Sequence, residues 1–216
     1  MPNNTTTIGR RGLLGLAIPV LVAATSWRTA RADAEADAAG PIQRLDAALL
    51  AAMKAGKGTA FAQRYAALEP VIEQTFDLDA VLGASIGFSW AGLPSDQKAQ
   101  LRAAFRRYTV ASYAANFDNY TGQTFQVAPA VRTVGNGEVV VATTIVAADG
   151  TSNKLDYVMR NTASGWKAVD VLADGSISRV AVQRSDFREL LKSGGTPALM
   201  AGLQRKVASL SGGMLA

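Results

Sequence analysis

Two serines of this chain stand in motifs that other proteins use for nucleophilic catalysis. Residues 83–87 read Gly-Ala-Ser-Ile-Gly and match the G-x-S-x-G nucleophile elbow, and residues 95–98 read Ser-Asp-Gln-Lys and match S-x-x-K. The elbow needs a histidine to accept the serine proton, and the chain contains none. The S-x-x-K motif lacks its partner triplets, S-D-N and K-T-G. We therefore interpret residues 83–87 as a helix end with flexible glycines and Ser95 as a helix N-cap.

Neither a phosphate site nor a metal site has a complete set of ligands. Residues 56–59 read Gly-Lys-Gly-Thr, like the tail of a phosphate loop, but Ala51 stands where the leading glycine is needed and no strand precedes it. Asp77 and Asp79 lack a third ligand. Without histidine or cysteine, the usual protein zinc sites are excluded. We predict no metal and no cofactor.

Three charged residues lie on adjacent predicted strands: Asp156, Arg160 and Asp170. A cross-strand ion pair explains them more simply than acid–base chemistry does. Asp170 interrupts a strand that is apolar on both faces, so its carboxylate must find a partner or lie at the mouth of a cavity. We predict that the protein is not an enzyme. A small isomerase-like enzyme that uses Asp170 or Asp156 as its base stays open as an alternative.

The elements that would position these residues follow from the spacing of apolar side chains, which changes from a period of 3.6 to a period of 2 after Gly122. Asn136-Gly137 is a strong hairpin signal. The pattern predicts helices over 33–55, 59–75, 76–87 and 96–120, strands over 124–134, 138–148, 155–160, 166–172 and 177–182, and closing helices over 185–192 and after residue 195. We predict an α+β fold in which helices wrap a strongly twisted antiparallel sheet of about five strands.

The first 32 residues have the features of a cleaved export signal. Arg10-Arg11 precedes an apolar run over residues 13–24, and Ala30-Arg31-Ala32 is a small-residue cleavage site. The signal is twin-arginine-like, and general secretory export stays open as the alternative. Its removal takes away four of the 22 basic residues and no acidic one, leaving a net charge of about +1 and no basic stripe for nucleic acid. Residues 33–216 then form a single exported domain without cysteine.

Several short motifs resemble a known family by their order and spacing. They are residues 61–77, then Trp90, Gln97 and residues 105–123, then residues 165–187 with Gly-Trp-Lys, Asp-Val, Asp-Gly-Ser-Ile-Ser and Arg-Ser-Asp-Phe. This order is similar to that of the MlaC/Ttg2D family of periplasmic lipid-binding proteins and covers roughly residues 59–210. The turn at 174–178 is one residue longer than in the phospholipid-carrying members. In this it resembles the HpnM branch, which is associated with hopanoid biosynthesis.

The resemblance implies a cone-shaped fold with an apolar pocket, and a periplasmic carrier that shuttles a hopanoid or phospholipid between inner- and outer-membrane components. Its implied partners are the lipid and a membrane-bound transporter of the ABC type or an outer-membrane complex. An apolar strand covered on both faces agrees with such a pocket. The candidate lipid-binding residues, each of which could instead be ordinary core, are Tyr108, Val139, Val141, Ile145, Leu155, Tyr157, Met159, Trp166, Val169, Val171, Phe187 and Leu191. A lipid-independent interaction module with a filled core stays open as a further alternative.

Overall fold

The computed structural model describes Met1 and residues 37–215, so the predicted export signal lies outside the described residues apart from Met1. One antiparallel sheet runs in the order β1-β3-β4-β5-β6, and β2 also pairs with β3. The strands are β1 (Thr124–Val127), β2 (Arg132–Thr133), β3 (Glu138–Val146), β4 (Ser152–Thr162), β5 (Gly165–Ala173) and β6 (Ile177–Ser178). This sheet with its helices confirms the predicted α+β class.

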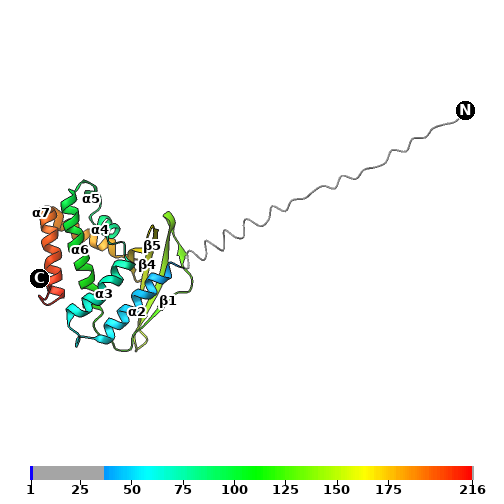
Figure 1. Ribbon diagram of the computed structural model, residues 1–216, viewed down its shortest axis with the longest axis horizontal. Coiled ribbons are helices and arrows are strands. Elements are labelled where there is room, and N and C mark those ends of the chain that lie inside the picture. The colour runs from blue at the N-terminus through cyan, green and yellow to red at the C-terminus, as the bar shows by residue number, and fades with distance from the viewer. Residues whose placement is uncertain (2–36, 216) are drawn as a thin grey trace.

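The helices lie to one side of the sheet (Figure 1). They are α2 (Ala39–Ala55), α3 (Phe61–Thr75), α4 (Leu78–Ile86), α5 (Ser89–Gly92), α6 (Ser95–Asn116) and α7 (Arg179–Leu210). In Figure 1, α2 and α3 lie next to the sheet, whereas α6 and the end of α7 lie farther out. No helix among the described residues combines the length and the apolarity needed to cross a membrane.

Turns in this fold occur where the sequence offers glycine or asparagine. A short 3-10 turn (η1, Gly135–Gly137) joins β2 to β3, and both Asn136 and Gly137 adopt positive φ there. This confirms the predicted hairpin. Gly195, with φ 64°, bends α7 between its two halves, which were predicted as separate helices. Helix α7 contacts α6, α4 and β5.

Two expectations about helix starts were wrong. Ser95 makes no capping hydrogen bond through its side chain, and Pro94 holds the N-cap position of α6. Residues 177–182 were expected to be a strand, but only Ile177–Ser178 is extended and α7 begins at Arg179. The reason is Ser178, whose Oγ accepts a hydrogen bond of 2.9 Å from the Ala181 N–H and so caps the helix.

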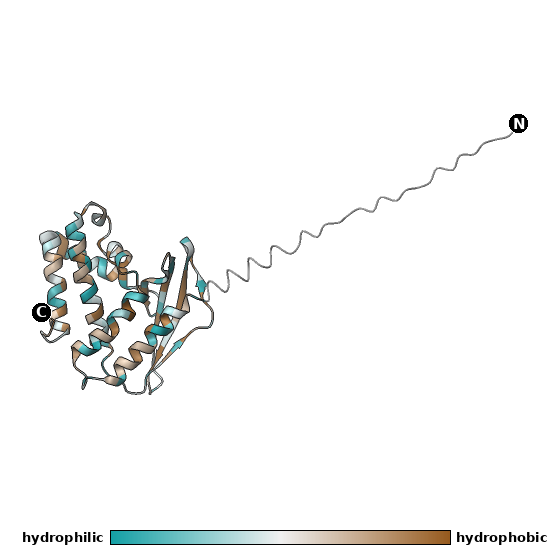
Figure 2. Ribbon diagram, in the orientation of Figure 1, coloured by the Kyte–Doolittle hydropathy of each residue, from teal (hydrophilic) through white to brown (hydrophobic). Residues whose placement is uncertain are grey.

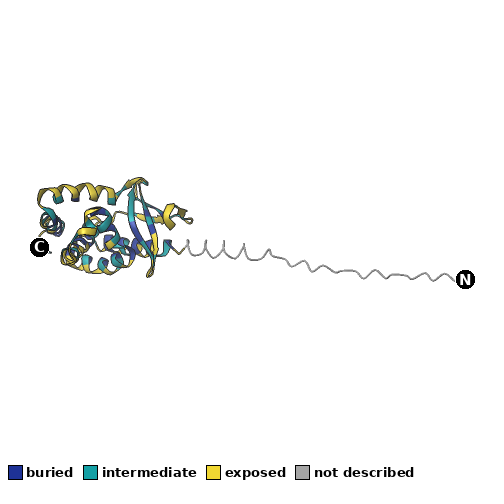
Figure 3. Ribbon diagram, turned by 90° about the horizontal axis from the view of Figure 1, so that it is seen from above, coloured by how far each residue is buried: buried dark blue, intermediate teal, exposed yellow. Residues whose placement is uncertain are grey.

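The apolar core consists of two clusters. Apolar stretches occur on both the helices and the strands (Figure 2), and the buried parts of the chain lie toward the middle of the molecule (Figure 3). The sheet cluster joins α2, α3 and α6 to the sheet and includes the buried residues Ile42, Leu45, Leu68, Ile72, Val141, Tyr157 and Met159. The outer cluster joins α4, α6 and α7 and includes Leu82, Leu101, Phe105, Phe187, Leu199 and Leu203. Helices α6 and α7 each contribute buried residues to both clusters and so connect them.

Candidate functional site

A cavity of about 360 Å³ lies between α6, α4, the first half of α7 and strands β4 and β5. It borders both apolar clusters, because Leu78 and Tyr108 in its wall pack against each of them. The lining residues are Phe76, Leu78, Val81, Phe105, Tyr108, Thr109, Ser112, Tyr113, Asn116, Phe117, Leu155, Asp170, Val171, Ala173, Arg179, Val180 and Gln183. Most of these side chains are apolar or aromatic, which is typical of small-molecule sites.

Aromatic rings form much of the cavity wall. Tyr113 stacks on Phe117, the residue just after the end of α6, with ring centroids 5.8 Å apart, and also contacts Phe76 at 5.7 Å. Phe105 contacts Tyr108 at 6.4 Å and meets Phe187 edge-on at 6.1 Å. Because these rings hold one another by contact, the wall is largely fixed without a ligand.

The hydroxyl groups on the α6 side of the cavity are already used within the helix. Thr109 Oγ1 donates to the Phe105 carbonyl at 2.9 Å, and Ser112 Oγ donates to the Tyr108 carbonyl at 2.8 Å. A serine or threonine hydroxyl has one proton, so these groups can only accept further hydrogen bonds. Burial raises the pKa of Tyr113, and the positive charge of Arg179 opposes this to a smaller degree. The phenol of Tyr113 therefore stays neutral.

Asp170 lies in the cavity wall and ties β5 to the start of α7. Its Oδ1 accepts hydrogen bonds from the Val171 N–H at 2.7 Å and the Val180 N–H at 3.1 Å, and its Oδ2 accepts one from the Ser178 hydroxyl. The expected ion pair among Asp156, Arg160 and Asp170 was wrong, since Arg160 forms its cross-strand pair with Glu138 of β3, at 2.7 Å. Asp170 was expected to have a hydrogen-bond partner or to lie at the mouth of a cavity, and it has partners and also lies in the cavity wall.

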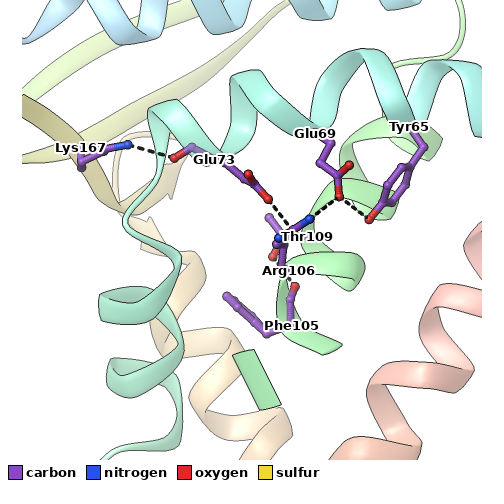
Figure 4. Close-up of polar contacts among 7 residues, drawn as sticks. All are labelled: Tyr65, Glu69, Glu73, Phe105, Arg106, Thr109 and Lys167. Carbon is purple, nitrogen blue, oxygen red and sulfur yellow. Dashed lines mark hydrogen bonds and ion pairs between the residues drawn. The ribbon is translucent and has the colours of Figure 1, made fainter. Parts of the chain in front are cut away.

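A polar network between α3 and α6 fixes the two helices against each other (Figure 4). Arg106 bonds to Glu69 at 3.0 Å and also pairs with Glu73, and Tyr65 donates to Glu69 at 3.3 Å. Burial, followed by the nearby charge of Glu69, raises the pKa of Tyr65 to about 12. The network therefore holds α3 in register with the helix that lines the cavity.

The end of α3 is fixed to the sheet in turn. Lys167 of β5 donates to the backbone carbonyls of Glu73 at 2.9 Å and Gln74 at 2.7 Å, as Figure 4 shows for Glu73. Just beyond, the Asp77 N–H donates to the Ala168 carbonyl at 3.0 Å, next to a parallel bridge between Phe76 and Ala168. These bonds place the Phe76 ring in the cavity wall.

A family model described as MlaC protein matches residues 43–205, which include all the residues that line the cavity. The chain belongs to the MlaC family. The fold also matches the structure of a phospholipid-binding protein from Ralstonia solanacearum, solved in complex with a phospholipid. The TM-score is 0.69 and the sequence identity is 22%, over 82% of this chain and 98% of that chain. This match places the chain in an MlaC-like fold.

Within this MlaC-family cavity, the structure brings together three of the twelve candidate lipid-binding residues: Tyr108, Leu155 and Val171. The others lie elsewhere. Val139, Val141, Tyr157 and Met159 are buried in the sheet cluster, Trp166 packs against its edge, Phe187 is buried in the outer cluster, Leu191 packs against that cluster, Val169 is buried on β5, and Ile145 is half-buried opposite Phe125 of β1.

The sequence argument missed most of the residues that line the cavity. The wall includes Phe76, Leu78, Val81, Thr109, Ser112, Tyr113, Phe117, Val180 and Gln183. One signal was available, because α6 carries two neighbouring stripes, one through Phe105 and Tyr108 and one through Tyr113 and Phe117. A helix with so wide an apolar arc packs against apolar neighbours on more than one side. Here α6 packs in both clusters, and the cavity borders both of them.

The motifs that resembled catalytic sites have structural roles. Ser85 is buried inside α4, with its hydroxyl 2.8 Å from the Val81 carbonyl. Asp77 caps α4 by accepting a hydrogen bond of 2.9 Å from the Ala80 N–H, and Asp79 pairs with Arg102 at 3.0 Å. Within the part of the chain that the structure describes, no group of three or more acidic, His or Cys residues could hold a metal ion.

Proposed function

We propose that this protein is a periplasmic lipid carrier that binds the apolar part of a lipid in the cavity beside α6 and moves it between inner- and outer-membrane components. The observation that carries the proposal is the aromatic-lined cavity of about 360 Å³ in a chain of the MlaC family. The interaction-module alternative predicts a filled core, so the cavity favours the carrier. Family membership likewise favours a binding protein over an enzyme.

The cavity can hold a lipid through apolar contacts. Removing apolar surface from water contributes about 25 cal/mol per Å², so a tail that buries a few hundred Å² gains on the order of 10 kcal/mol. The volume lies at the lower end of the range for small-molecule sites, roughly 300–1,000 Å³. It therefore suits one tail or part of a larger lipid.

The lipid is a phospholipid or a hopanoid. The Ralstonia solanacearum protein with this fold was solved with a phospholipid, which supports the first. The longer turn at residues 174–178 resembles the HpnM branch and supports the second. In either case the carrier would reach the periplasm through the predicted signal at residues 1–32 and would exchange its lipid with a membrane-bound transporter or an outer-membrane complex.

Native mass spectrometry of the protein purified from its own periplasm tests this proposal, with extraction and identification of any bound lipid. A stoichiometric phospholipid supports the general carrier, and a stoichiometric hopanoid supports the HpnM-like carrier. The N-terminus of the same sample shows whether residues 1–32 have been removed. A lipid-free protein that also resists loading with both lipid classes would contradict the carrier function.

A further inference from the structure

The cavity wall contains two charged side chains, and they differ in how they are used. Asp170 has both carboxylate oxygens engaged at the start of α7, where the partial positive charge of the helix N-terminus offsets its own charge. Arg179, the first residue of α7, makes no hydrogen bond and no ion pair through its guanidinium with any described residue. The cavity therefore has one charged donor group that the protein itself leaves unused.

The direction of Arg179 follows from how α6 and α7 pass each other. Phe105 of α6 contacts Phe187 of α7. Eight residues further along α6 is Tyr113, whose pKa the charge of Arg179 lowers, and Arg179 precedes Phe187 by eight residues in α7. The two segments thus run antiparallel along the cavity. Arg179 lies at the same end as Asn116, whose side-chain amide lines the cavity and has no hydrogen-bond partner among the described residues.

The backbone N–H groups at the start of α7 are not available to bind a ligand. The Val180 N–H donates to Asp170 and the Ala181 N–H donates to Ser178, so the start of the helix is already capped. On the α6 side, Thr109 and Ser112 have used their protons within the helix. The wall at this end also contains the phenol of Tyr113 and the side-chain amide of Gln183, but Arg179 carries the charged donor group. Arg179 and Asn116 are both exposed to solvent. An apolar wall that ends in unused donors suits an amphiphile with an oxyanion.

We propose that Arg179, assisted by Asn116, binds the anionic oxygens of the ligand's polar group and so determines the preference of this site for anionic over neutral lipids. This inference rests on the proposed carrier function and assigns its specificity to named residues. A guanidinium can donate two parallel hydrogen bonds to a phosphate or carboxylate, which an uncharged side chain cannot do. Since the site is solvent-exposed, the preference should weaken at high salt.

A competition between two lipids that differ only in the phosphate tests the proposal. The delipidated protein is incubated with equal amounts of dioleoyl phosphatidic acid and dioleoylglycerol, and native mass spectrometry gives the ratio of the two complexes. We expect the wild-type protein to favour phosphatidic acid roughly tenfold or more. Arg179→Gln should bring the ratio close to one through loss of phosphatidic acid, and Arg179→Lys should keep part of the preference.

Arg188→Gln is the matched control, because Arg188 is an exposed arginine of the same helix that does not line the cavity. It should leave the ratio unchanged, and equal melting temperatures exclude misfolding as the cause. If Arg179→Gln keeps the wild-type ratio while both lipids bind, the role of Arg179 is wrong and the carrier function stands. If neither lipid binds to the wild type, this inference and the phospholipid carrier both fail, and the carrier function itself fails if a hopanoid does not bind either. Displacement of phosphatidic acid by millimolar inorganic phosphate would mean a free-phosphate site and would overturn the lipid assignment.

Discussion

Asp46 lies on the face of α2 that packs toward the sheet, with 5% of its surface exposed, and no described residue donates a hydrogen bond to either of its carboxylate oxygens. Burial of the charged form raises its pKa from 3.8 to about 7. Nearby are the buried phenols of Tyr113 and Tyr157, whose own pKa values burial also raises. At neutral pH this carboxyl group is therefore close to its midpoint of ionisation, inside the core.

The raised pKa of Asp46 predicts that it destabilises the fold at high pH. Below pH 4 the group is protonated in both states and contributes nothing. Between pH 4 and pH 7 only the unfolded chain ionises, so stability falls, and above pH 7 the loss levels off at about 4 kcal/mol. Asp46→Asn should remove this dependence. Urea unfolding of the wild type and of Asp46→Asn at pH 5 and pH 8 checks this prediction. An equal change in the free energy of unfolding between the two pH values in both proteins would contradict it.

A substitution at Ser112 can test whether the cavity holds the lipid, and it does so without removing a charged side chain. Its side chain points into the cavity from α6 and is half-buried. Ser112→Trp should fill the volume and reduce lipid per protein at least tenfold, measured by lipid extraction. Overpacking in a filled core costs about 1–3 kcal/mol, so a nearly unchanged melting temperature would show that the space was free. Ala99→Trp, on the exposed face of α6, is the control and should keep its lipid.

At the scale of elements, the start of α7 depends on Asp170. Asp170→Ala leaves the Ser178 hydroxyl and two backbone N–H groups without their acceptor, so we expect a loss of about 1–3 kcal/mol in the free energy of unfolding. Asp186→Ala, which removes an exposed pairing with Lys206 at 3.3 Å, should change it by less than about 1 kcal/mol. Urea denaturation measures both. An unchanged stability for Asp170→Ala would mean that its bonds do not hold α7.

Most elements could be predicted from the sequence, because apolar spacing and glycine-containing turns identify them locally. The boundary between β6 and α7 could not. Ile177, Val180 and Val182 are β-branched residues that favour a strand. The helix begins at Arg179 because Ser178 and Asp170 satisfy its first N–H groups, and Asp170 comes from a neighbouring strand. A cap supplied by another element leaves no trace in the local pattern.

At the scale of the whole molecule, local sequence patterns also could not predict which residues line the cavity. Alternation along β3 and β4 identified residues that are buried, and Val141, Tyr157 and Met159 are buried. It could not show whether protein or ligand fills the space beside them, since that depends on how α6 and α7 pack. The family resemblance came from motif order rather than from periodicity, and membership in the MlaC family is confirmed over residues 43–205.

The position of the cavity between the sheet cluster and the outer cluster has a consequence for how the protein unfolds. Without a ligand, the two clusters are joined through α6 and α7 and through Leu78 and Tyr108 in the cavity wall, which pack against both. A bound tail would contact both and act as a shared part of the core. Calorimetry should therefore show a broader transition for the delipidated protein, with a calorimetric enthalpy above the van't Hoff value, and a single cooperative transition once lipid is added. Equal widths in both states would mean that the lipid does not couple the clusters.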